Sequence, residues 1–126
     1  MFKKLGLILS TVLFAIAAFA FVASPAVAAS KTVKMGTDTY QLKFDPSEVT
    51  VSPGDTIKFQ NNNLPPHNII FDQEPFKSLA MEPTKMLLTP SDSYTITVPD
   101  DAAAGTYTFF CAPHKGAGMT GKLIVQ

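Results

Sequence analysis

Hydrophobic and polar residues alternate with a period of two in several stretches between residues 48 and 126. Such alternation is typical of β-strands with one face buried and the other in water. Turn-forming pairs such as Pro53-Gly54 and Pro99-Asp100 separate the stretches. The alternating apolar positions are Val49/Val51, Ile57/Phe59, Tyr94/Ile96/Val98, Tyr107/Phe109 and Leu123/Val125, and Ile69-Ile70-Phe71 is a further apolar run.

Strands at this spacing, without helices between them, predict an all-β fold. We expect an antiparallel β-sandwich or barrel of about seven or eight strands. The one helical candidate spans Phe76–Met81. Glu82-Pro83 would end it, because the residue before a proline disfavours the helical conformation.

The first 28 residues follow a different pattern. Lys3 and Lys4 precede an apolar run at residues 5–22, and Ala26-Val27-Ala28 follows. A charged start, an apolar middle and a small-residue exit are typical of a secretory signal peptide. We therefore predict a removed signal peptide at residues 1–28 and one exported domain at residues 29–126. The alternative is a retained membrane anchor, because the apolar run is long enough to span a bilayer.

Composition and charge argue against a nucleic-acid-binding protein and against a disordered chain. The 126 residues include 10 lysines and 10 acidic residues, so the chain lacks the basic balance of a nucleic-acid-binding domain. With 46% hydrophobic and 16% charged residues, the chain can bury a core rather than stay disordered. It has one cysteine, so no internal disulfide can form. A lone thiol in an oxidising compartment needs another role.

The residue types that bind soft metals gather near the carboxyl end. Cys111, His114 and Met119 share one short loop after a predicted strand, and His67 precedes the apolar run at 69–71. No acidic residue follows Asp101, which excludes calcium and magnesium sites because these ions need oxygen ligands. Zinc would use one Cys and two His and leave a position open. Copper accepts all four, and two His, one Cys and a weak axial Met are typical of blue-copper electron-transfer sites.

These residues admit three other interpretations. Cys111 and His114 would serve a thiol enzyme as nucleophile and base, but a small sandwich offers little room for a cleft. A copper-delivery or storage protein would bind the metal without rapid redox change. The Gly116–Gly121 stretch spells a dinucleotide-binding motif, but a strand follows it where that motif requires a helix.

The sequence resembles the cupredoxins, and among them the plastocyanin family of cyanobacterial type. The resemblance covers essentially the whole predicted mature chain, although the Cys-x2-His-x4-Met spacing alone would also fit a pseudoazurin-like periplasmic cupredoxin. The stretches that carry it are Asn61-Asn62, Pro66-His67-Asn68-Ile69, Phe71-Asp72, Gly105-Thr106-Tyr107 and Cys111 to Lys122.

The resemblance implies an eight-stranded Greek-key β-sandwich with one short helical segment. It implies one copper ion, alternating between Cu(I) and Cu(II), on His67, Cys111, His114 and Met119. The protein would be a monomeric electron carrier rather than an enzyme. It would take electrons from cytochrome f of the cytochrome bf complex and pass them to photosystem I. It would work in the thylakoid lumen, in transient contact with membrane complexes on the lumenal side.

The resemblance also assigns roles to residues around the metal. The backbone N–H of Asn68 would point at the Cys111 sulfur, and its side chain would tie the two ligand segments together. His114 would present one ring edge through an apolar surface, beside which Lys115 adds a positive charge. That surface would comprise Leu42, Leu64, Pro66, Gly116 and Ala117, and Pro46 and Pro66 would follow cis peptide bonds.

Overall fold

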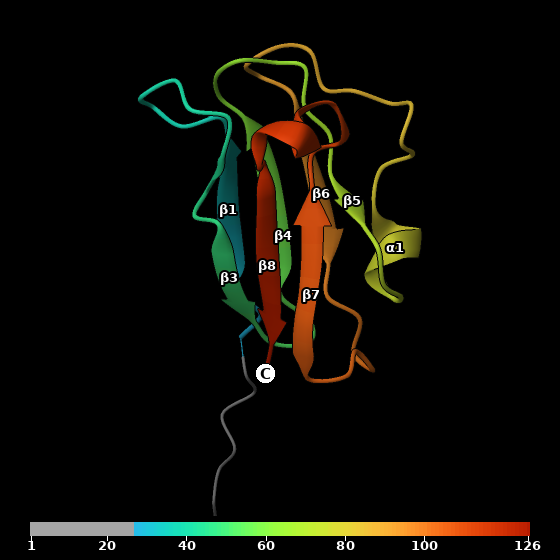
Figure 1. The fold of residues 1–126 in the computed structure, drawn as a ribbon. Helices are drawn as coiled ribbons and strands as arrows, with labels where there is room; N and C mark the ends of the chain where they lie inside the picture. Colours follow the sequence, from blue (N-terminus) through green and yellow to red (C-terminus); the bar gives the residue numbers. More distant parts are fainter. Residues whose placement is uncertain (1–26) are drawn as a thin grey trace, which may run out of the picture.

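The computed structural model describes residues 27–126 as a two-layer β-sandwich (Figure 1). The eight strands are β1 (Ser30–Met35), β2 (Phe44–Asp45), β3 (Glu48–Val51), β4 (Thr56–Asn61), β5 (Ile70–Phe71), β6 (Ser93–Thr97), β7 (Gly105–Phe110) and β8 (Thr120–Val125). Two short helices complete the fold, α1 (Phe76–Leu79) and the 3-10 helix η1 (Ala112–Ala117). The predicted signal peptide at residues 1–28 falls almost wholly outside the described residues. Within them, no helix is long and apolar enough to cross a bilayer.

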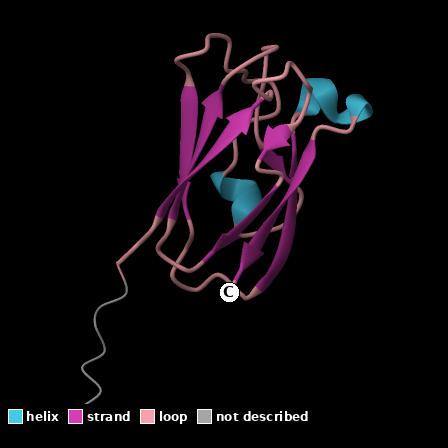
Figure 2. Cartoon of the chain, turned by 90° about the vertical axis from the view of Figure 1, so that its left-hand side faces the viewer, coloured by secondary structure: helices cyan, strands magenta, loops and turns pink. Residues whose placement is uncertain are grey.

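Each layer is a four-stranded sheet, and Figure 2 shows the two sheets edge-on. The strand order is β2-β1-β4-β6 in one sheet and β3-β8-β7-β5 in the other. The predicted all-β sandwich is confirmed, but purely antiparallel pairing is wrong, because β1 pairs with β4 and β3 with β8 in parallel. Alternation predicts which face of a strand is buried and leaves the direction of its neighbour open.

Two strands at the start of the domain were not predicted. In β1 only Val33 and Met35 are buried, and the other four residues are one serine, one threonine and two lysines. β2 has two residues, too few for a period to be recognised. The helical prediction is nearly correct, because α1 begins at Phe76 and ends at Leu79, where Ala80 turns to an extended conformation.

The core between the sheets is built on aromatic side chains. The ring centroid of Phe109, from β7, lies 4.8 Å from that of Phe44 and 5.4 Å from that of Phe59. Phe44 and Phe59 both belong to the opposite sheet. All three side chains are almost completely buried, and their edge-to-face geometry is a favourable one for aromatic pairs. This packing fixes the two sheets against each other, and with them the strand ends from which the loops start.

The loops that matter for function lie at the end away from the carboxyl terminus. Figure 1 shows η1, the β4–β5 connection and the chain between α1 and β6 meeting there. The Pro65-Pro66 bond in the β4–β5 connection is cis, as is Asp45-Pro46, so both cis predictions are confirmed; Glu74-Pro75 is also cis.

At the other end, the Asp55 carboxylate closes the turn between β3 and β4. It accepts hydrogen bonds of 2.8 Å from the backbone N–H groups of Ala29 and Ser52. These bonds, Ser52 first, hold the pKa of Asp55 below its ordinary value of 3.8 and outweigh the opposing effect of burial. The charged form is therefore favoured in the folded protein.

We expect Asp55→Asn to lower the free energy of unfolding at neutral pH and to have less effect in acid. A carboxyl group with a depressed folded pKa stabilises the fold above its unfolded pKa, and this contribution is lost as the pH falls through the folded pKa. Urea unfolding followed by circular dichroism should show the two proteins converging between about pH 5 and pH 2. Asp101→Asn, at an exposed carboxylate, is the control and should leave the pH profile unchanged.

Candidate metal centre

His67 enters the site from the β4–β5 connection and is completely buried. Its backbone pairs with Leu87, with N–H to carbonyl distances of 3.1 Å and 2.8 Å, which fixes the main chain. Its Nε2 lies 2.6 Å from the Asn63 carbonyl oxygen. Because a carbonyl only accepts hydrogen bonds, Nε2 is the donor, and in the neutral ring Nδ1 keeps a free lone pair. That lone pair faces the Cys111 sulfur, 3.6 Å away.

Cys111 follows the last residue of β7 and is also completely buried. Its Sγ lies 3.5 Å from His114 Nδ1, besides its contact with His67. Burial raises the pKa of the Cys111 thiol, and hydrogen bonds from Asn68 and His114 oppose this only in part. Burial also lowers the pKa of His67. The pocket thus favours neutral side chains, and a metal cation would supply the charge that favours a thiolate.

His114 and Met119 are positioned by η1, which the sequence did not predict. The helix begins after Cys111 with a proline in its first turn and ends at Ala117, and Gly118 caps it in a left-handed conformation. The Met119 N–H then donates to the His114 carbonyl, at 3.2 Å, and the Cys111 N–H to the Met119 carbonyl, at 3.1 Å. The turn therefore folds Met119 back beside Cys111, and the Met119 side chain is completely buried.

Asn68 joins the two ligand segments as predicted. Its Oδ1 accepts a 2.8 Å hydrogen bond from the Ala112 N–H, 44 residues along the chain, and its backbone acts to lower the pKa of the Cys111 thiol against the effect of burial. Its Nδ2 donates to the Pro83 and Lys85 carbonyls at 3.2 Å and 3.3 Å. One buried amide thus links three loops of the site.

The nitrogen and sulfur atoms are spaced for one metal ion. The ligand atoms of His67, Cys111 and His114 all lie within 4.8 Å of one another. A metal ion about 2.0–2.1 Å from a histidine nitrogen and about 2.3 Å from a thiolate, with angles between tetrahedral and trigonal, separates the two by about 3.5–3.8 Å. The observed 3.6 Å and 3.5 Å agree with this range. A thiolate and two imidazoles are the donor set that copper prefers.

Most of the residues that were predicted to form an apolar surface beside His114 are exposed. Leu64, Pro66, Gly116 and Ala117 are exposed, whereas Leu42 and His114 itself are half-buried. The Lys115 ammonium lies over the Phe110 ring, 4.0 Å from its centroid. The positive charge is therefore held beside this surface by a cation–π contact.

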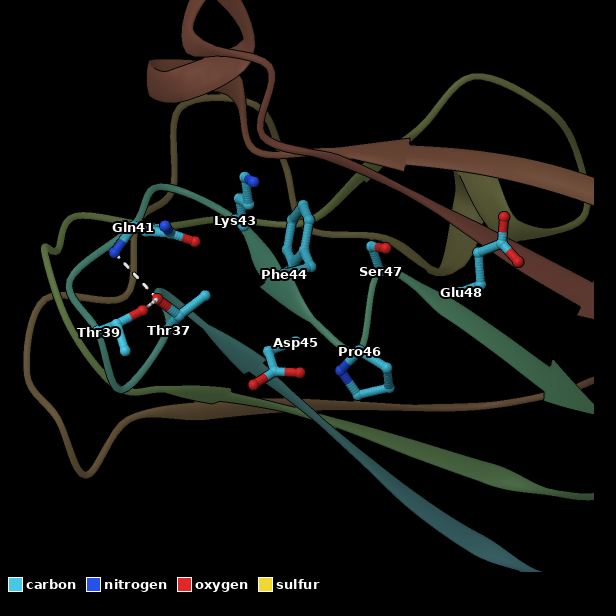
Figure 3. Close-up of a pocket in the computed structure, with 9 residues that line it drawn as sticks. All are labelled: Thr37, Thr39, Gln41, Lys43, Phe44, Asp45, Pro46, Ser47 and Glu48. Atoms are coloured by element: carbon cyan, nitrogen blue, oxygen red, sulfur yellow. Dashed lines mark hydrogen bonds between the residues drawn. The ribbon is translucent and has the colours of Figure 1, made fainter.

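A separate surface groove runs beside β2, between the 37–41 loop and the start of β3 (Figure 3). Its lining residues are Thr37, Thr39, Gln41, Lys43, Phe44, Asp45, Pro46, Ser47 and Glu48. None of the residues with metal-binding nitrogen or sulfur lines it, so the groove is distinct from the metal centre.

An eight-stranded two-sheet sandwich with a Cys-His-His cluster among the loops at one end defines a copper protein of the cupredoxin class. A family model described as "Copper binding proteins, plastocyanin/azurin family" matches residues 31–126. The chain belongs to this family, and within it the chain is of the cyanobacterial plastocyanin type: an electron carrier, not an enzyme.

Individual relatives support this placement. The plastocyanin of Nostoc punctiforme is 40% identical over 130 residues, which cover 98% of this chain and 94% of the relative. The oxidised plastocyanin of Dryopteris crassirhizoma has a TM-score of 0.66 at 33% identity, covering 75% of this chain and 99% of that one. A pseudoazurin of Methylobacterium extorquens has a TM-score of 0.52 at 28% identity, covering 76% and 74%. The likeness to plastocyanin is therefore closer than that to this pseudoazurin.

Proposed function

We propose that His67, Cys111, His114 and Met119 bind a single copper ion, and that the protein carries electrons from cytochrome f to photosystem I. The observation that supports this most directly is the convergence of three ligand atoms from two distant loops within 4.8 Å. Copper, when bound, supplies a one-electron couple between Cu(I) and Cu(II). The relatives named plastocyanin support the same assignment.

The surrounding residues keep the site rigid and dry. The Asn63 carbonyl holds the His67 ring, Asn68 holds the Cys111 segment, and the Met119 side chain is completely buried. Because the ligands are already placed before metal binding, little rearrangement accompanies a change in metal charge. Such a site suits electron transfer better than turnover of a substrate.

The exposed edge at His114 is the proposed route for electrons. Of the four proposed ligands only His114 is partly exposed, and Gly116 and Ala117, which follow it closely in the chain, are small. A partner can therefore approach closely over Gly116 and Ala117. Contacts of this kind in electron carriers are small, below about 1,200 Å², and short-lived.

The visible spectrum and voltammetry of the copper-loaded protein test the proposed function. We expect an intense thiolate-to-copper band in the oxidised form and a fast, reversible one-electron response. Stopped-flow mixing with cytochrome f and flash oxidation by photosystem I then test the two partners separately. A colourless Cu(II) complex would contradict the site, and slow or irreversible redox change would favour copper delivery instead.

We expect Gly116→Leu to slow electron transfer to a partner without destabilising the fold. A Cβ at Gly116 meets no atom within 4 Å, so the leucine extends into solvent beside His114 and separates the partner from the site. A docking penalty of about 1.4 kcal/mol would weaken the complex about tenfold. Ala103→Leu, at an exposed position in the β6–β7 loop, is the control. Equal rates for the two variants in stopped-flow measurements would place the contact elsewhere.

We also propose that residues 1–28 are removed on export to the thylakoid lumen. Cleavage after Ala28 would turn the Ala29 N–H into an ammonium group, 2.8 Å from the Asp55 carboxylate. That charge pair would hold the new amino terminus beside β4. Mass spectrometry of the protein recovered from the lumen should give an amino terminus at Ala29, and an intact leader would contradict the proposal.

A further inference from the structure

We propose that Gly36 is a positioning residue for His67, although it contacts none of the metal-binding atoms. The lack of a side chain at Gly36 allows the Asn63 carbonyl to reach the place where it holds the imidazole. This inference rests on the proposed role of His67 as a metal ligand. It concerns how the ring is oriented before any metal binds.

The Asn63 carbonyl is placed by contacts with the end of β1 and the residues after it. The Asn63 N–H donates to the Met35 carbonyl at 3.3 Å, and the Asn63 Nδ2 donates to the Thr37 carbonyl at 2.8 Å. The preceding Asn62 binds the same segment, with its Nδ2 donating to the Gly36 carbonyl at 2.9 Å. The backbone at 62–63 therefore lies directly against the backbone at 35–37.

Thr37 is itself held by its own loop. Its hydroxyl accepts a 3.0 Å hydrogen bond from the Gln41 N–H and lies 3.0 Å from the Thr39 hydroxyl (Figure 3). The Gly36 N–H also donates to the Lys43 carbonyl at 3.0 Å. The support beneath Asn63 is thus a closed loop with internal bonds, which resists displacement.

At Gly36 the backbones of residues 35–37 and 62–63 lie too close together to admit a side chain. Gly36 is buried, and its φ of +80° is one that residues with a side chain rarely adopt. A Cβ there would lie 2.1 Å from the Asn63 carbonyl oxygen and 2.8 Å from its carbon. Increasing the distance between this Cβ and the Asn63 oxygen to 3.0 Å requires one of the two backbone segments to shift by about 0.9 Å. The atoms that the Cβ would meet belong to the backbone, so no side chain can move aside to make room.

A shift of that size acts directly on His67. The Nε2 to carbonyl distance is 2.6 Å, so displacing the oxygen lengthens or misaligns the bond that fixes the ring. Without that acceptor the ring can rotate, and the proton is no longer confined to Nε2. Loss of a partner that orients a metal-binding histidine typically lowers metal affinity by about 10- to 100-fold.

The decisive comparison is Gly36→Ala against Gly54→Ala. Gly54 has a similar φ of +89°, but the nearest atom to a Cβ there, Asp100 Oδ1, is 3.8 Å away. Both variants therefore suffer the same kind of backbone strain, and only Gly36→Ala displaces the Asn63 carbonyl. The difference between them isolates the effect of that carbonyl from a general loss of stability.

Two readouts report on the His67 ring. In the nitrogen-15-labelled apoprotein, we expect the His67 Nε2 proton of Gly36→Ala to exchange with solvent about tenfold faster than in the parent. In the copper-loaded protein, we expect about tenfold weaker copper binding in chelator competition and a shifted charge-transfer band. Gly54→Ala should match the parent in both. A folded Gly36→Ala protein with parental exchange and affinity would overturn the inference, as would equal changes in Gly54→Ala.

A second pair of variants adds no bulk and covers the case in which Gly36→Ala does not fold. Asn63→Ala removes the bond to the Thr37 carbonyl, whereas Asn61→Ala removes the bond of a neighbouring asparagine to the Thr89 carbonyl, outside the 35–37 segment. We expect faster Nε2 proton exchange in Asn63→Ala only, and the same rate in both variants would overturn the inference. Because exchange is measured without metal, failure of the parent to bind copper would refute the proposed function and leave this test intact.

Discussion

Replacing Cys111 by serine is expected to abolish the intense visible absorption of the copper-loaded protein completely. That band requires charge transfer from a thiolate, and Cys111 is the only cysteine in the chain. A serine hydroxyl is a hard ligand with a far higher pKa, so it replaces neither the charge nor the softness of the sulfur. We also expect copper to be held much more weakly, because the remaining nitrogen ligands lose their anionic partner. Titration with Cu(II), followed by visible spectroscopy and chelator competition, checks both effects.

The fold of the Cys111→Ser protein should survive, which makes the result interpretable. Serine is slightly smaller than cysteine, and its hydroxyl can donate and accept hydrogen bonds in the place of the thiol. We therefore expect the unfolding free energy of the apoprotein to change by no more than about 1–2 kcal/mol. Survival of the intense band in this variant would exclude the assigned thiolate. A colourless variant that is also unfolded would be recognised by circular dichroism.

The sequence predicted the parts of the fold that repeat locally. Buried positions such as Ile57, Phe59 and Phe109 predict their strands, because the alternation of apolar and polar residues can be recognised within a few neighbouring residues. The parallel neighbours of β1 and β3 were not predictable in this way, because pairing is decided between segments far apart in the chain. The pattern of β1 itself is weak, because only two of its six residues are buried and the others are a serine, a threonine and two lysines.

In the metal centre too, the features that are local in the sequence were predictable and those that depend on distant segments were not. Cys111, His114 and Met119 lie within nine residues, so their spacing alone indicates one site. His67 is 44 residues from Cys111, so no local spacing links the two, and His67 was predicted from the scarcity of histidine and from the resemblance of residues 66–69 to the family. The Asn63 carbonyl had no signal, because a backbone acceptor carries no residue identity. Neither did Gly36, whose role depends on which backbone approaches it.

The two ligand segments belong to different parts of the sandwich. His67 lies where the chain leaves β4 of one sheet for β5 of the other, and Cys111 follows β7. The aromatic core fixes the distance between the sheets, but it does not set the position of loops at their ends. The buried Asn68 side chain bonds directly across this gap, to Ala112. Its removal is therefore expected to affect stability and metal binding together.

We expect Asn68→Ala to lower the unfolding free energy of the apoprotein by about 2–4 kcal/mol. The substitution leaves the Ala112 N–H and the Pro83 and Lys85 carbonyls without this partner. An unsatisfied buried polar group costs about 1–3 kcal/mol, and some of these groups can recover water because Ala112 is only half-buried. That loss is a large part of a typical stability of about 5–15 kcal/mol. Urea unfolding of parent and variant measures it.

Asn61→Ala is the matched control, because Asn61 is also a buried asparagine, whose Nδ2 donates a 2.9 Å bond to the Thr89 carbonyl. It ties together two segments that carry no metal ligand, so its loss should cost about 1 kcal/mol and leave the copper band unchanged. Asn68→Ala should in addition release copper faster, because the His67 and Cys111 segments can then separate. If both variants released copper at the parental rate, Asn68 would stabilise the fold without holding the ligands together.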